Sequence, residues 1–232
     1  MTNIGWASTR SPIPIGSELR VHALPMFAIH TFLLEQYRHP EFGAANVRPG
    51  DLVVDGGSFW GDTALWLAEQ CGERGRVIAF EPDRANAPVL EANLHANPVL
   101  ARRIELRFEA LWEREALLEL TPGGPGSSVE VGRGSGRIPA VSLDALLRRG
   151  TPERVDFLKL DIEGAERSAL RGARELIREQ APRIAAAIYH RADDILVLPR
   201  LLDELLPAYR FALTHRSLHQ FDTMLFAWTD PN

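Results

Sequence analysis

The chain has 232 residues, of which 45% are hydrophobic, and its formal net charge at pH 7 is −5. That length and composition suffice for one sizeable core, so we expect one main domain. Lys and Arg form no tail or stripe that could neutralise a run of phosphates, and we expect no nucleic-acid partner. No apolar run approaches the ~20 residues of a membrane span, and no signal-peptide stretch opens the chain. Because Cys71 is the single cysteine, which suits a reducing compartment, we expect a cytoplasmic protein that binds no membrane.

The first 44 residues are expected to form an arm and a cap helix beside a main domain of residues 45–232. Residues 1–20 are punctuated by Pro, Gly and Ser, as in an extended arm. Residues 21–38 place apolar side chains on one broad face. This pattern predicts a helix that lies over the rest of the chain.

Apolar runs alternate with helical patterns along the main domain, which predicts a parallel sheet with helices on both faces. The predicted strands are residues 52–55, 76–81, 103–110, 155–162 and 183–190. The predicted helices are residues 62–70, 84–96, 142–149, 165–179 and 193–206, with Ser142 as a candidate N-cap. Residues 121–139 are expected to be a turn-rich, flexible excursion. Residues 209–215 and 221–228 predict a closing hairpin, which brings the sheet to seven strands, one of them antiparallel.

A glycine-rich turn, Asp55-Gly56-Gly57-Ser58-Phe59-Trp60-Gly61, follows the first predicted strand, at the edge where ligands of such sheets bind. The turn does not match the dinucleotide fingerprint G-x-G-x-x-G, since Phe59 stands where a second glycine is needed after Gly57. Asp62, in the first turn of the next helix, would also repel a phosphate. These features favour a ligand without phosphates whose ammonium group Asp55 could receive. S-adenosylmethionine meets both conditions.

Glu81 ends the second predicted strand, 20 residues after Gly61. A carboxylate at this spacing typically accepts hydrogen bonds from ribose hydroxyls. Dehydrogenases share the feature, so an NAD-dependent oxidoreductase is one alternative, and a non-catalytic module that binds S-adenosylmethionine is another. Each acid also has a structural alternative, because Asp55 could cap a neighbouring helix and Glu81 could pair with Arg84.

Several segments of the chain resemble the FkbM-type methyltransferases: VVDGGSFWGDT, AFEPD, VDFLKLDIEGAERSALRGA and the closing HRADD…YRFALTHRS…DTMLFA. The resemblance covers about residues 45–228. It implies the Rossmann-like class I methyltransferase fold, an α/β fold with a seven-stranded, mostly parallel sheet whose last strand is antiparallel. It also implies an S-adenosylmethionine-dependent enzyme that methylates a hydroxyl of a small natural product, sugar or lipid. The family more often has Ala-Asn-Ile where this chain has Ser58-Phe59-Trp60. This departure lies in the glycine-rich turn, so the detailed contacts with the cofactor are expected to differ from those of the family.

The resemblance places the cofactor against the glycine loop and against the ends of the next two strands. The residues that it implies for cofactor binding are Asp55, Gly57, Gly61, Thr63, Glu81, Glu109 and Ala110. We expect their neighbours Gly56, Ser58, Asp62 and Pro82 to contribute as well. The segment 109–111 is implied to lie near the adenine. Because the first 40 residues carry little resemblance, we expect the choice of substrate to lie there.

Methyl transfer to a hydroxyl needs a group that accepts the hydroxyl proton while the reactants are held in line. The strand pattern places candidates at the carboxyl ends of successive strands: Asp161, His190 and His215. His190 is the preferred general base, since an unperturbed imidazole has a pKa of ~6.5. The alternatives are that His190 ties its strand to a helix near Asp193 or Asp194, and that His215 is a solvated hairpin residue.

Lys159 is the chain's single lysine and lies in an apolar strand, so once buried it must be paired or neutral. Pairing with Asp161 or another acid is one interpretation, and a neutral amine acting as a base is the other. Asp161, Glu163 and His190 could hold a divalent cation such as Mg²⁺, but their spacing is not compact and we expect no resident metal. As partners we expect a small-molecule acceptor, and the sequence allows a homodimer.

Overall fold

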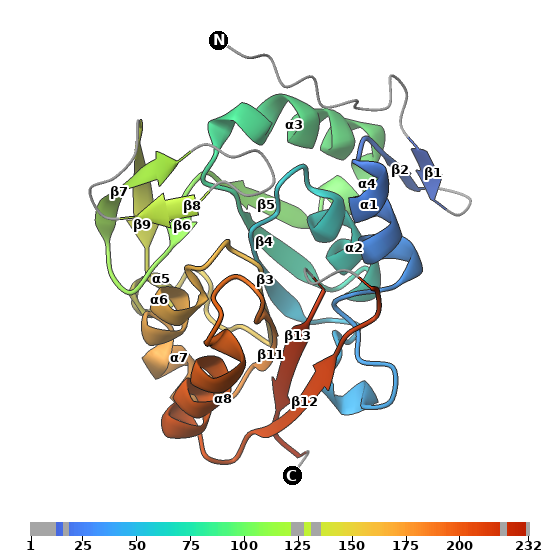
Figure 1. The fold of residues 1–232 in the computed structure, drawn as a ribbon. Coiled ribbons are helices and arrows are strands. Elements are labelled where there is room, and N and C mark those ends of the chain that lie inside the picture. The colour runs from blue at the N-terminus through green and yellow to red at the C-terminus, as the bar shows by residue number, and fades with distance from the viewer. Residues whose placement is uncertain (1–12, 16–18, 122–127, 131–135, 219–221, 231–232) are drawn as a thin grey trace.

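The computed structural model describes residues 13–15, 19–121, 128–130, 136–218 and 222–230 (Figure 1). Its centre is a seven-stranded sheet in the order β12-β13-β11-β10-β3-β4-β5. The strands are β3 Leu52–Gly56, β4 Arg76–Phe80, β5 Ile104–Arg107, β10 Phe157–Leu160, β11 Arg183–Ala187, β12 Arg210–Thr214 and β13 Met224–Trp228. β13 runs antiparallel to both of its neighbours, whereas the other pairs in the sheet are parallel. The predicted α/β fold, with a seven-stranded and mostly parallel sheet, is confirmed.

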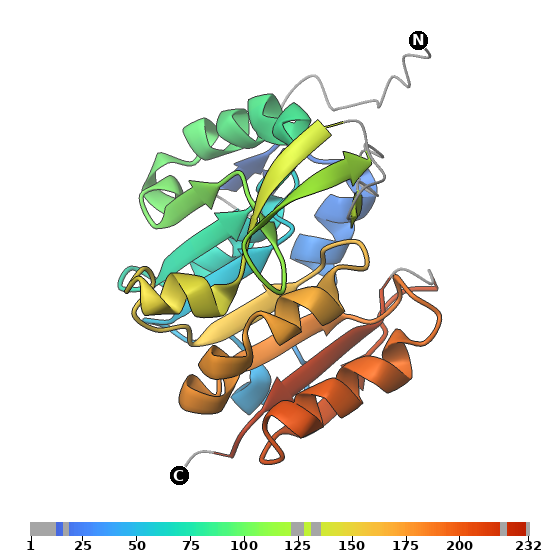
Figure 2. The ribbon, with the colours of Figure 1, turned by 90° about the vertical axis from the view of Figure 1, so that its left-hand side faces the viewer.

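Helices cover both faces of this sheet (Figures 1 and 2), because its central strands bury side chains on both sides. Successive residues of a strand point to opposite faces, and both Val53 and Val54 of β3 are fully buried. On the Val54 face lie α5 Leu143–Arg148, α6 Glu166–Arg171, α7 Arg174–Gln180 and α8 Asp194–Leu205. On the Val53 face lies α2 Asp62–Gln70, which is followed by α3 Ala87–Ala96 and α4 Pro98–Ala101. None of the described helices is both long and apolar enough to cross a bilayer.

The N-terminal segment contains less helix than the sequence predicts. β1 Ile13–Ile15 and β2 Leu19–Val21 pair antiparallel, and α1 Pro25–Ala28 and the π-helix η1 Ile29–Leu33 follow them. Pro25 lies in the first turn of α1, where its missing N–H is not needed, so it begins the helix. The predicted helix 21–38 is therefore wrong at both ends, and the predicted arm includes two strands. Residues 1–12 and 16–18 of the predicted arm lie outside the described residues.

A smaller sheet that the sequence did not predict follows β5. It consists of β6 Ala110–Leu111, β7 Ala116–Thr121, β8 Ser128–Glu130 and β9 Gly136–Val141, in the order β6-β9-β7-β8. The predicted strand 103–110 thus stops at Arg107, and its last residue enters the second sheet. The predicted excursion 121–139 is strand in part, while its residues 122–127 and 131–135 lie outside the described residues.

The helices of the main domain follow the predictions with one break. Ser142 caps α5 as expected, accepting a hydrogen bond from the backbone N of Ala145 at 3.2 Å. The predicted helix 165–179 is interrupted at Gly172, where a Cβ atom would lie 2.1 Å from the carbonyl oxygen of Trp112. The backbone thus passes the second sheet so closely that position 172 has no room for a side chain, and the helix is divided there into α6 and α7. The remaining short elements are the 3₁₀ turns η2 Gly43–Ala45 and η3 Arg84–Asn86.

An ion pair between Lys159 and Asp55 lies buried where β10 and β3 run side by side. The two residues are partners in the parallel register, and their side chains are 1% and 0% exposed. The Nζ atom lies 3.0 Å from Oδ1 of Asp55 and donates hydrogen bonds to the carbonyl oxygens of Gly56 and Gly57 at 2.9 and 2.6 Å. The pairing interpretation of Lys159 is confirmed, with Asp55 as the partner acid.

Replacing Lys159 by methionine should destabilise the chain strongly. The substitution leaves the carboxylate of Asp55 charged and buried, and removing one partner of such a pair typically costs about 3–5 kcal/mol. Urea unfolding followed by circular dichroism measures the loss. Arg148→Met is a matched control, because Arg148 pairs with Glu175 at the surface and such pairs contribute about 0–1 kcal/mol. Equal losses in the two variants would contradict a structural role for the buried pair.

Candidate active site

The glycine loop brings the carboxyl ends of β3 and β10 into close contact. Gly57 has a φ of +80°, and a Cβ atom there would lie 1.9 Å from the carbonyl oxygen of Asp161. Only glycine tolerates both the left-handed conformation and this approach. Gly61 has a φ of +81° and stands before the first turn of α2, against Leu90. The loop thus packs tightly on both sides, and Gly56 and Ser58 are buried within it.

Asp55 does not face a cavity, because its two oxygens are engaged inside the sheet. One contacts Lys159, and the other accepts a hydrogen bond from the hydroxyl of Thr63 at 2.7 Å. The expectation that Asp55 receives an ammonium group from a ligand is therefore corrected: the ammonium beside it belongs to Lys159. The same contact places Lys159 in the sheet interior, which contradicts its interpretation as a neutral base.

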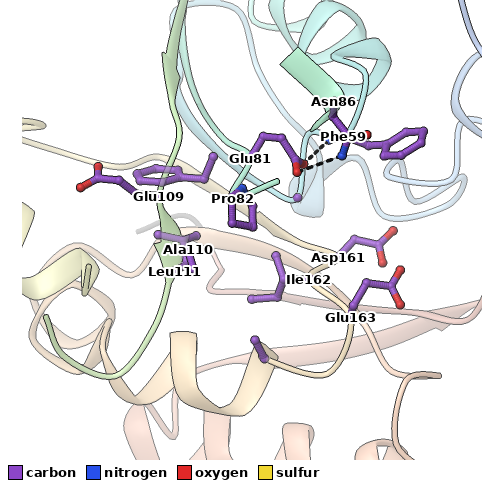
Figure 3. Close-up of a pocket in the computed structure, with 13 residues that line it drawn as sticks. Phe59, Glu81, Pro82, Asn86, Glu109, Ala110, Leu111, Asp161, Ile162 and Glu163 are labelled. Carbon is purple, nitrogen blue, oxygen red and sulfur yellow. Dashed lines mark hydrogen bonds between the residues drawn. The ribbon is translucent and has the colours of Figure 1, made fainter. Parts of the chain in front are cut away.

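A narrow cavity opens beside the end of β4 (Figure 3). Among its lining residues are Gly57, Phe59, Glu81, Pro82, Glu109, Ala110, Leu111, Asp161, Ile162 and Glu163. In Figure 3 the carboxylate of Glu81 points toward Phe59 and Asn86, whereas that of Glu109 points away from the other labelled side chains. The sequence-predicted set of Glu81, Pro82, Glu109 and Ala110 is thus brought together here.

Glu81 is held by three donors in a buried position. Its carboxylate accepts hydrogen bonds from the backbone N of Phe59 at 2.8 Å, the backbone N of Asp83 at 2.9 Å and the Nδ2 of Asn86 at 3.1 Å. Burial nevertheless raises its pKa to about 7, against the opposing effect of these donors. A carboxylate has about four acceptor positions, so one remains for a further donor.

A wider cavity of about 440 Å³ adjoins the narrow one and shares Gly57, Phe59, Asp161 and Glu163 with it. The N-terminal segment covers it with Met26, Phe27, His30, Thr31, Gln36 and Tyr37. Asp62 and Thr63, in the first turn of α2, also line this cavity. So do Tyr189 and His190, which follow the end of β11. The two cavities together form a cleft along the carboxyl edge of the sheet.

Asp62 is the acid of the glycine loop region that faces the wide cavity. It is buried and accepts a hydrogen bond from the hydroxyl of Thr31 at 3.1 Å. Burial raises its pKa to about 6. The contact with Thr31 joins the covering N-terminal segment to α2.

Asp161 lies at the centre of a polar cluster in the wide cavity. Its two oxygens accept hydrogen bonds from the hydroxyls of Tyr37 at 2.7 Å and Tyr189 at 2.8 Å. Burial raises the pKa of both phenols well above the usual range, so both act as donors. Burial would also raise the pKa of Asp161, but the charges of His190 and Lys159 lower it below its usual range.

His190 is surrounded by carboxylates. Its Nδ1 lies 2.8 Å from Oε1 of Glu166, and its Nε2 lies 3.4 Å from Asp161 and 3.5 Å from Glu163. Burial alone would lower the pKa of the imidazole, but Glu163, Glu166 and Asp161 outweigh it and raise the pKa to about 11. The expectation of an imidazole that accepts a proton near neutral pH is therefore corrected, because His190 already holds one.

His215 lies apart from this cluster. It follows β12 at the edge of the sheet, where its Nδ1 is 2.9 Å from the hydroxyl of Thr223. It lines a separate surface hollow together with Arg216 and residues 39–42. This placement agrees with the interpretation of His215 as a solvated hairpin residue.

Sequence reasoning missed four side chains that line or support the cleft: His30, Tyr37, Glu166 and Tyr189. Tyr37 lies in a segment that the sequence predicted only as a cover, and nothing in its pattern pointed to Asp161. Tyr189 directly precedes His190, so its position at a strand end was an available signal. Glu166 lies in the first turn of α6, and nothing in the local sequence pattern pointed to its contact with His190.

Comparison with known proteins identifies relatives that match much of the chain. The family model described as the methyltransferase FkbM domain matches residues 41–213. Methyltransferase sdnD from Sordaria araneosa is 28% identical over 169 residues, which are 58% of this chain and 64% of that protein. The crystal structure of methyltransferase FkbM from Methylobacillus flagellatus KT matches with a TM-score of 0.65 and 27% identity, over 84% of this chain and 49% of that one.

A more distant structure shares the fold alone. Precorrin-6y C5,15-methyltransferase from Geobacter metallireducens GS-15 matches with a TM-score of 0.54 and 11% identity, over 87% of this chain and 88% of that one. The present chain spans about half of the Methylobacillus protein and under two thirds of the Sordaria protein. Because the family model matches most of the chain, including both strand ends that meet at Gly57, the chain belongs to the methyltransferase FkbM domain family.

Proposed function

We propose that the chain is an S-adenosylmethionine-dependent methyltransferase that methylates an oxygen atom of a small molecule. The observation that carries the proposal is the pair of adjoining cavities that meet at Gly57, Phe59, Asp161 and Glu163. A group-transfer enzyme must hold donor and acceptor side by side, since much of its advantage comes from orientation. Family membership supports the class of reaction.

The residues of the cleft fit S-adenosylmethionine. Gly57 lets the backbone approach the β10 end without a side chain in the way, and Glu81 keeps one acceptor position beside the narrow cavity. Apolar groups of Pro82, Ala110 and Ile162 line that cavity and suit an adenine ring. Asp62 supplies the negative charge that an ammonium group needs.

Each of these residues has a distinct task in the proposal. Glu81 would accept hydrogen bonds from ribose hydroxyls, and Asp62 would bind the ammonium group of the amino-acid part. When bound, the cofactor would supply a methyl group on a positively charged sulfur. The acceptor oxygen would bond to the methyl carbon as the carbon–sulfur bond breaks, so that S-adenosylhomocysteine leaves and the hydroxyl proton passes to Asp161. Asp161, oriented by Tyr37 and Tyr189, would accept a hydrogen bond from the acceptor hydroxyl and fix its oxygen.

The covering N-terminal segment argues for a small acceptor. Met26, Phe27 and Tyr37 enclose the wide cavity together with Phe59, whose ring stacks on Trp60 at 4.8 Å between centroids. Such a mixture of apolar walls and a few polar groups is typical of small-molecule sites. The polar groups here are hydroxyls and carboxylates, which suit an acceptor that carries hydroxyl groups.

Glu81→Gln should weaken the binding of S-adenosylhomocysteine about ten- to a hundredfold, because hydrogen bonds to a charged group contribute about 1.5–3 kcal/mol. Ribose hydroxyls favour the ionised carboxylate, whose pKa is about 7 without ligand. Wild-type affinity should therefore be nearly full at pH 8 and about tenfold lower at pH 6. Isothermal titration calorimetry at both pH values measures this. Glu105→Gln, an exposed acid on β5, is the control. Unchanged affinity in Glu81→Gln would remove Glu81 from the site.

Asp62→Asn should weaken the binding of S-adenosylhomocysteine about ten- to a hundredfold through the loss of a charged contact. It should leave the affinity for 5′-methylthioadenosine within about threefold, because that compound has the adenine and ribose but no ammonium group. Glu81→Gln should weaken the binding of both compounds, because both contain the ribose. If Asp62→Asn binds both ligands as the wild type does, the ammonium group has another partner.

A further inference from the structure

Three side chains in the wide cavity have the arrangement of a metal site. Ligand atoms of Asp161, Glu163 and His190 all lie within 4.8 Å of one another. The Nε2 of His190 is 3.4 Å from Asp161 and 3.5 Å from Glu163. Ligands about 2.0–2.2 Å from a shared cation lie roughly 3 Å apart in octahedral geometry, so a small inward movement would complete the set. Figure 3 shows the carboxylates of Asp161 and Glu163 side by side and pointing the same way.

The Nε2 of His190 is a buried polar atom with no hydrogen-bond partner. The side chain is only 7% exposed, and the two nearby carboxylates lie at ion-pair rather than hydrogen-bond distance. A buried polar atom without a partner costs free energy, and a bound cation would take the place of the Nε2 proton and supply that partner. The atom is aimed at the space between Asp161 and Glu163, where such a cation would lie.

The surrounding contacts match those that support metal ligands. The Nδ1 of His190 is held by Glu166, which also accepts a hydrogen bond from the backbone N of Ile162 at 2.9 Å. Metal-bound histidines usually make such a contact through their second nitrogen, which fixes the ring and its tautomer. Tyr37 and Tyr189 orient Asp161 in the same way and leave each of its oxygens a free lone pair.

The backbone is strained where Glu163 enters the cavity. Glu163 has a φ of +54°, a left-handed conformation that is uncommon for a residue with a side chain, and Gly164 follows at +91°. Such strain persists where the surrounding structure requires it, often at functional sites. Glu163 makes an ion-pair contact with His190 at 3.5 Å, so the strained backbone presents its carboxylate to the cluster.

We propose that Asp161, Glu163 and His190 form a divalent-cation site whose remaining coordination positions face the wide cavity. One nitrogen and two carboxylate donors favour Mn²⁺ over the more oxygen-selective Mg²⁺. Metal binding at this cluster does not depend on the proposed function. The proposal replaces our sequence-based expectation that no metal is resident.

The test is a titration of the metal-free full chain with Mn²⁺. Binding is measured by calorimetry and by the electron paramagnetic resonance signal of the free Mn²⁺. We expect one Mn²⁺ per wild-type chain. Glu163→Gln should bind Mn²⁺ at least tenfold more weakly, because it removes a charged ligand that is one-third exposed and adds little strain. Glu69→Gln, an exposed acid on α2, should bind as the wild type does. His190→Asn, checked by circular dichroism, should lose binding as well.

No binding by the wild type, or equal binding by Glu163→Gln and Glu69→Gln, would overturn the metal site. S-adenosylhomocysteine binding, measured on the same variants, keeps this result separate from the proposed function. Glu163→Gln with normal S-adenosylhomocysteine affinity and lost Mn²⁺ binding supports the metal site directly. A wild type that binds S-adenosylhomocysteine but no Mn²⁺ leaves the methyltransferase proposal intact and removes the metal.

Discussion

The ammonium group of Lys159 is buried between the carboxyl ends of β3 and β10, where it neutralises Asp55 and binds the carbonyl oxygens of Gly56 and Gly57. In a low-dielectric interior neither charge is tolerable alone, so the pair fixes how these strands meet. The glycine loop can then turn over the end of β10, with Gly57 against the carbonyl of Asp161. The positions of both cavities follow from this contact, because both include Gly57 and Asp161 among their walls.

The same edge of the sheet separates two kinds of acid. Glu81 and Asp62 are isolated carboxylates whose pKa values burial raises to about 7 and about 6, so a ligand's donors or positive charge would stabilise them. Asp161 and Glu163 are instead gathered around His190, where the excess of negative charge calls for a cation. The first pair suits a positively charged nucleoside, and the second group forms the proposed metal site. Glu81 lines the narrow cavity, whereas Asp62 shares the wide cavity with the second group, so both kinds of acid meet in one cleft.

Much of the fold could be predicted because the strands and helices of the main sheet follow apolar runs of the right period. The second sheet was missed because residues 121–139 are rich in Gly, Pro and Ser, which predict turns, although β7 and β9 have six residues each. The break at Gly172 depends on the passing carbonyl of Trp112, a contact that no local pattern reveals. At the site, the acids and His190 were found from their positions at strand ends. Their charge states were not, since the partner of Asp55 and the raised pKa of His190 depend on distances between separate strands and loops.

The site depends most on the close approach of the backbone at Gly57, and Gly57→Ala tests this dependence directly. An added Cβ would lie 1.9 Å from the carbonyl oxygen of Asp161, so the two strand ends must move apart. Calorimetry with S-adenosylhomocysteine should show at least a tenfold loss of affinity in a variant whose circular dichroism is still that of a folded protein. Gly43→Ala is the control, since nothing lies within 4 Å of the Cβ added there. Wild-type affinity in Gly57→Ala would contradict the claim that this contact forms the site.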